Sequence, residues 1–91
     1  MKISEFEHYL RKTIHSEKSI ESRISKGKKA EEILNMSFDD VVKDDKTVFN
    51  SLEKLHKHEK PEHTPMQNSL RHYYKMVNNK EFPRKKNYTN N

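Results

Sequence analysis

The stretch QNSLRHYYKMVNNKEFPRKKNY, residues 67–88, decides the fold because its apolar residues recur at helical spacing. Thr64 followed by Pro65 is a favourable cap and first-turn pair, since proline has no amide hydrogen to leave unpaired at a helix start. One arc of the helical wheel holds Met66, Leu70, Tyr73, Tyr74, Met76 and Val77. We therefore predict an amphipathic helix from residue 65 to about residue 80 whose two tyrosines belong to the core or its edge.

The opposite side of this helix is polar. It carries Asn68, Arg71, His72 and Lys75. These side chains supply donors for base edges and phosphates, at a spacing that lets a helix enter a major groove. The alternative is an ordinary solvated face. After Lys80 the sequence predicts a tail anchored by Phe82, with a basic cluster at Arg84, Lys85 and Lys86.

Further helices are predicted upstream. SEFE, residues 4–7, has the spacing of a capping box and opens a helix over residues 4–14. Ser16 can cap a helix over residues 17–34, and Ser37 with Asp40 resembles a second capping box that opens a helix of about two turns. Apolar residues then repeat at helical spacing over residues 45–58.

The helix predicted at residues 17–34 has a basic, hydroxyl-bearing back. Ile20, Ile24, Gly27 and Leu34 fall on one narrow apolar stripe. The opposite side carries Lys18, Ser19, Ser22, Lys26 and Lys29. Because glycine destabilises a helix interior, Gly27 within the apolar stripe indicates that another backbone passes close to it.

Composition limits the architecture to one small helical domain. The chain has 91 residues, 30% of them hydrophobic, with one Gly, three Pro and no Cys. A β-sandwich would need more turn residues, and neither disulfides nor a Cys-based zinc site can stabilise the core. We predict an all-α bundle of four or five helices at residues 1–82 and a basic, flexible tail at residues 83–91. The sequence lacks a secretory signal and a membrane span, so we expect a soluble, cytoplasmic protein.

Charge is distributed unevenly along the chain. Residues 1–30 carry eight basic and four acidic side chains, residues 31–62 five and nine, and residues 63–91 six and one. Such a distribution can orient the molecule on a polyanion with the acidic middle held away from the phosphates. Solubility alone is the competing explanation for the net charge of +5.

Catalysis and metal binding are not expected. RHYYK, residues 71–75, places Arg, His and Tyr side by side, but adjacent residues on a helix point in different directions and do not converge on one phosphate. His56 and His58, two apart on a helix, diverge by about 200°, so they do not share one ion within it. We expect no enzyme activity, no cofactor and no metal site.

The succession of ISEFEHYL, SEKSIESRISKGKKAEEIL, SLEKL and QNSLRHYYKMVNNKEFPR resembles the N-terminal core-binding, or SAM-like, domain of phage-integrase-type tyrosine recombinases. The resemblance covers nearly the whole chain and implies a bundle that clamps double-stranded recombination-site DNA. It implies DNA contacts at Ser19, Ser22, Arg23, Lys26 and Lys29, and at Asn68, Arg71, His72 and Lys75. The catalytic residues of that family belong to a separate C-terminal domain, for which 91 residues leave no room.

Two settings remain open for such a domain. It is either part of a larger recombinase, with a catalytic domain C-terminal to it, or a stand-alone phage or mobile-element protein. In the second setting it would bind and modulate a host protein through the acidic middle or the tyrosine-bearing helix. A large exposed apolar patch would favour protein binding. We expect the apolar residues to be only sufficient for one core, which favours DNA.

Overall fold

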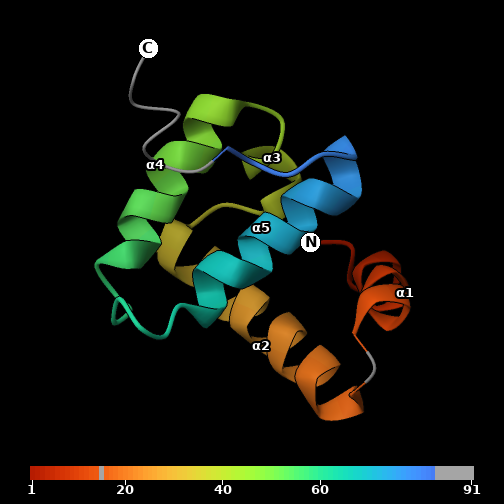
Figure 1. Ribbon diagram of the computed structural model, residues 1–91. Helices are drawn as coiled ribbons and strands as arrows, with labels where there is room; N and C mark the ends of the chain where they lie inside the picture. The colour runs from red at the N-terminus through yellow and green to blue at the C-terminus, as the bar shows by residue number, and fades with distance from the viewer. Residues whose placement is uncertain (15, 84–91) are drawn as a thin grey trace.

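A computed structural model describes residues 1–14 and 16–83. It confirms a small all-helical bundle (Figure 1). In chain order its elements are α1 (Ile3–Thr13), α2 (Glu17–Leu34), α3 (Phe38–Val41), α4 (Asp45–His56) and α5 (Pro65–Asn78). Of the tail predicted at residues 83–91, only Pro83 lies within the described residues. No helix among the described residues is both long and apolar enough to cross a membrane.

The core forms around the pair α2 and α5, which pack against each other more extensively than any other two helices of the described chain. In Figure 1 these two helices cross near the middle of the bundle. Tyr73 and Tyr74 are fully buried, as predicted, and the ring of Phe6 meets that of Tyr73 edge-on at 5.1 Å. Other large buried apolar residues include Leu10, Phe38, Leu55, Leu70 and Phe82.

Side-chain caps begin three of the helices. Ser16 accepts a hydrogen bond from the amide of Ser19, and Ser37 accepts one from the amide of Asp40, so both predicted caps are confirmed. Asp44 caps α4 by accepting from the amide of Thr47. Each cap satisfies an amide at the helix start that has no intrahelical acceptor.

The predicted capping box at Ser4 is wrong. The helix begins at Ile3, so Ser4 lies inside its first turn, and Lys2 occupies the cap position without a side-chain cap. The amide of Lys2 instead donates to the hydroxyl of Tyr73 at 2.9 Å. A tertiary contact with α5 therefore sets this helix start, and the local sequence pattern does not.

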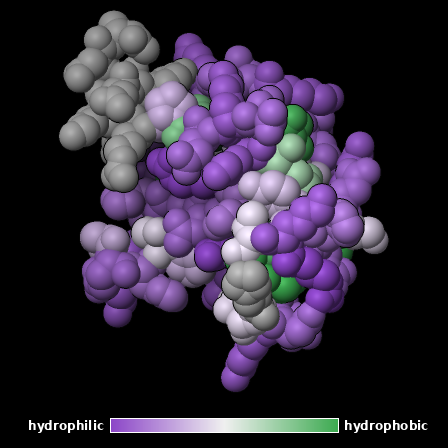
Figure 2. All heavy atoms as spheres, turned by 45° about the vertical axis from the view of Figure 1, so that its right-hand side comes forward, coloured by the Kyte–Doolittle hydropathy of each residue, from purple (hydrophilic) through white to green (hydrophobic). Residues whose placement is uncertain are grey.

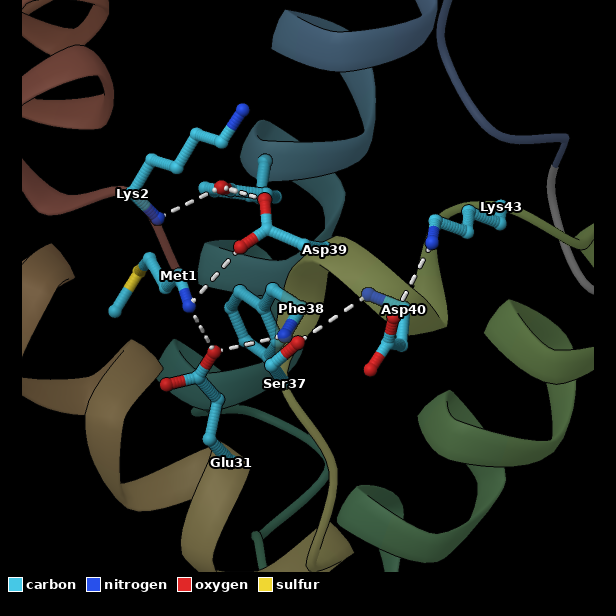
Figure 3. Close-up of polar contacts among 9 residues, drawn as sticks. Met1, Lys2, Glu31, Ser37, Phe38, Asp39, Asp40 and Lys43 are labelled. Carbon is cyan, nitrogen blue, oxygen red and sulfur yellow. Dashed lines mark hydrogen bonds and ion pairs between the residues drawn. The ribbon is translucent and has the colours of Figure 1, made fainter.

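Figure 3 shows the polar network that holds the first residues of the chain against α2 and α3. The Met1 ammonium lies 2.9 Å from Glu31 and 3.3 Å from Asp39, and the Tyr73 hydroxyl donates to Asp39 at 2.5 Å. Burial alone would lower the pKa of the ammonium, but Glu31 and Asp39 raise it above its ordinary value. Burial opposes ionisation of Asp39 too, yet hydrogen bonds from Tyr73 and the ammonium lower its pKa.

The predicted position of the start of α5 is confirmed, but the predicted cap is wrong. Pro65 is in the first turn, as predicted, but the side chain of Thr64 makes no cap hydrogen bond. The carboxylate of Glu59 replaces it by accepting from the amides of Met66 at 2.6 Å and Gln67 at 3.2 Å. A charged acceptor satisfies two free amides and complements the positive end of the helix dipole.

Gly27 marks a close approach, as predicted, but side chains make it. A Cβ atom at this position would lie 2.8 Å from the Oγ of Ser69 on α5 and 3.2 Å from the Cε of Met1. The three atoms nearest to such a Cβ belong to the side chains of Ser69 and Met1. The missing side chain lets α5 and the first residue settle against α2.

Candidate nucleic-acid interface

A groove of about 440 Å³ runs between the first turns of α2 and the start of α5. We call it the α2–α5 groove. It is lined by Ser16, Lys18, Ser19, Ser22, Arg23, Lys26, His63, Pro65 and Asn68. No acidic residue lines it among the described residues. Five of the residues predicted to bind DNA are therefore brought together here, namely Ser19, Ser22, Arg23, Lys26 and Asn68.

Helix packing fixes the relation between the two walls of this groove. The buried hydroxyl of Ser69 on α5 donates a hydrogen bond of 2.8 Å to the backbone carbonyl of Arg23 on α2. One helical turn further along α2, Gly27 leaves room for the same serine. The polar faces flanking this contact consequently adjoin each other and form one continuous surface.

The electrostatics of α5 show that cations from both helices share this surface. His72 is half-buried, and burial lowers its pKa below the ordinary value. The positive charges of Arg23 on α2 and Lys75 on α5 lower that pKa further. Since a protonated His72 would be repelled by both neighbours, the surface is one on which an anion would be stabilised.

Arg23 is the half-buried arginine of the groove. The structure encloses its Nε atom, which has no hydrogen-bond partner among the described residues. Buried polar groups are nearly always hydrogen-bonded, so an unpaired donor at a groove wall is unusual.

Arg71 differs from its predicted neighbours. Its guanidinium lies 5.9 Å from the centre of the Phe82 ring, and its Nη1 donates to the Phe82 carbonyl at 3.4 Å. It also lines a separate small cavity with Phe49 and Glu53 of α4. Because it faces α4, Arg71 does not share the groove with Asn68.

The remaining predicted residues fall into two groups. Lys29 and Lys75 are exposed on α2 and α5 but do not line the groove. Arg84, Lys85 and Lys86 lie outside the described residues. The groove also contains Lys18 and His63, which were not predicted as site residues. Periodicity does place Lys18 on the polar side of this helix, one turn before Ser22, but the family resemblance implies no DNA contact for it. His63 lies in the connection before α5, where no periodicity applies.

A second and larger groove, of about 640 Å³, lies between α1 and α5. We call it the α1–α5 groove. Its apolar lining comes from Tyr9, Tyr73, Met76 and Val77, and Val77 is 51% exposed. Figure 2 shows a mainly hydrophilic face on which a few hydrophobic side chains reach the surface. We expected the apolar residues to suffice only for one core. At this groove, however, apolar side chains are also exposed.

The part of the chain that the structure describes contains no group of three or more His, Cys, Asp or Glu placed to hold a metal ion. Comparisons with protein-family models, with curated proteins and with solved structures found no match.

Proposed function

We propose that this protein binds double-stranded DNA, using the α2–α5 groove and the exposed lysines beside it. The observation that carries the proposal is the meeting of Arg23 and Lys26 from α2 with Asn68 from α5 in one groove, whose described lining residues include no acid. Lysine and arginine neutralise backbone phosphates, and hydroxyl and amide groups position the backbone by hydrogen bonds.

Contacts of this kind hold the backbone and read little sequence. A lone domain should therefore bind duplex DNA with a dissociation constant of roughly 10⁻⁴ to 10⁻⁶ M at physiological salt. If about four to six phosphates are neutralised, the logarithm of the association constant should fall with that of salt at a slope of roughly −4 to −5.

The finer proposal is that the domain holds DNA for a tyrosine recombinase whose catalytic residues belong to another domain. It rests on the resemblance of the sequence and on the all-helical bundle, which suits that family. The proposal predicts that the chain alone retains duplex DNA but neither cleaves nor joins it.

Fluorescence anisotropy with a labelled generic duplex tests DNA binding. Changing Lys26 and Lys29 together to Glu should abolish binding, because it puts two negative charges on the phosphate-facing side of α2. The matched control changes Lys46 and Lys54 together to Glu. Both lysines are exposed on α4 and do not line the groove. Both double variants alter the net charge equally. Equal loss of binding in the two, or normal binding by the first, would reject the proposed surface.

A second candidate function is docking of a host protein, and the α1–α5 groove is the observation that favours it. Exposed apolar area beside polar residues is typical of protein-binding sites. Replacing Val77 with Asp should then remove a captured partner in a lysate pull-down and leave DNA affinity unchanged. If the unmodified protein captures no partner, or if the Val77→Asp variant captures the same partners, this candidate function is rejected.

A further inference from the structure

We infer that the α2–α5 groove is a binding site for one phosphate group, and that Arg23 turns its guanidinium into the groove to hold it. The assignment of this phosphate to a DNA backbone rests on the proposed function. The chemistry of the groove is that of a phosphate site whichever molecule supplies the group.

Arg23 carries the inference because its backbone is fixed while its side chain has hydrogen-bonding capacity to spare. Ser69 holds its carbonyl at 2.8 Å, so the position of its Cα against α5 is set. Its Nε donor is enclosed and has no acceptor within the described residues. An arginine fork that meets a phosphate can form two parallel hydrogen bonds, which a lysine does not provide.

The other lining residues indicate which part of a ligand enters the groove. Lys18 and Lys26 add positive charge, and Ser19 and Ser22 add hydroxyl donors. Among the described residues that line the groove, only His63 has an aromatic ring on which a base could stack, so these residues suit a phosphate better than a nucleobase. The lowered pKa of the neighbouring His72 agrees with a surplus of positive charge at this place.

A movement of the side chain follows from its burial. Because the Nε of Arg23 is enclosed, a ligand oxygen reaches it only when the guanidinium turns outward. The arriving oxygens then supply the acceptor that the enclosed position lacks, and this favours the turned-out conformation in the bound state.

NMR of the arginine Nε–H groups tests the site directly. Inorganic phosphate and, separately, a short blunt duplex would be titrated into the labelled protein. We expect a saturable shift of the Arg23 Nε–H signal with each, together with the amides of Ser19 and Ser22. Arg23→Lys keeps the charge but removes this donor, so it should weaken duplex binding about tenfold with an unchanged salt slope. The matched control is Arg11→Lys, because Arg11 pairs with Glu7 and Glu17 outside the groove.

The two titrations distinguish the possible sources of the phosphate. Saturation by both ligands supports a site for DNA backbone. Saturation by inorganic phosphate without duplex binding supports the phosphate site and rejects the DNA function. Duplex binding that leaves the Arg23 signal unchanged rejects the site and leaves the proposed function standing. A phosphate titration without saturation at Arg23, or an Arg23→Lys variant that behaves like Arg11→Lys, overturns the inference.

Discussion

The hydroxyl of Ser69 on α5 donates a 2.8 Å hydrogen bond to the carbonyl of Arg23 on α2 and so links the two helices that carry the candidate interface. The contact is buried, and it aligns the polar flanks of both helices. Stability and the proposed DNA binding thus involve the same helix pair, and we expect substitutions to separate the two properties.

The first prediction concerns Gly27. A Cβ atom there would lie 2.8 Å from the Oγ of Ser69, so Gly27→Ala should lower the free energy of unfolding by about 1–3 kcal/mol, the usual cost of overpacking. Removing that oxygen with Ser69→Ala should make Gly27→Ala much less harmful, since the flexible Met1 side chain is then the remaining obstacle. Urea denaturation of the two single variants and the double variant measures the coupling. Strictly additive effects would contradict the described contact.

The second prediction assigns Arg71 to stability. Its guanidinium packs over the Phe82 ring and donates to the Phe82 carbonyl, so Arg71→Gln should destabilise the fold by about 0.5–1 kcal/mol. DNA affinity, measured below the melting temperature, should change little beyond the loss of one positive charge. A loss of affinity as large as that of the Lys26 and Lys29 double variant would show that Arg71 faces the DNA.

The third prediction is a pH dependence that originates at His72. Its pKa in the folded protein lies below the unfolded value of about 6.5, so the unfolded state takes up the proton more readily. The free energy of unfolding should therefore fall as the pH decreases below about 6.5, toward the pKa of the folded state. His72→Gln should flatten this part of the profile in denaturation experiments from pH 7.5 to 5. An unchanged slope in the variant would contradict a lowered pKa of His72 in the folded protein, whose causes are burial and then the charges of Arg23 and Lys75.

The sequence predicts those parts of the fold that depend on local patterns. The caps at Ser16 and Ser37, Pro65 in the first turn of α5 and the buried Tyr73 and Tyr74 follow from residue types a few positions apart. Where the local pattern predicts the wrong cap, a residue outside that pattern makes the hydrogen bond instead. Glu59 caps α5 from seven residues away, and Tyr73 accepts from Lys2 near the start of α1.

The candidate interface follows the same rule. Helical periodicity identifies the polar backs of the helices and thereby Ser19, Ser22, Lys26 and Asn68. It does not reveal that Arg71 turns toward Phe82, because the broad polar side of the helix includes both Arg71 and His72, and only the tertiary packing distinguishes their surroundings. Nor does periodicity reach His63, whose place beside the groove is set by the turn before α5.

The central claim is that α2 and α5 present one cationic surface to DNA, and the salt dependence of duplex binding by single lysine variants tests it most directly. Lys26→Gln on α2 and Lys75→Gln on α5 should each reduce the steepness of the logarithmic salt slope by about 0.9, and the double variant by about twice that. Lys54→Gln on α4 should leave the slope unchanged. If Lys26→Gln reduces the slope while Lys75→Gln does not, α5 does not share the contact and the account of a single surface is contradicted.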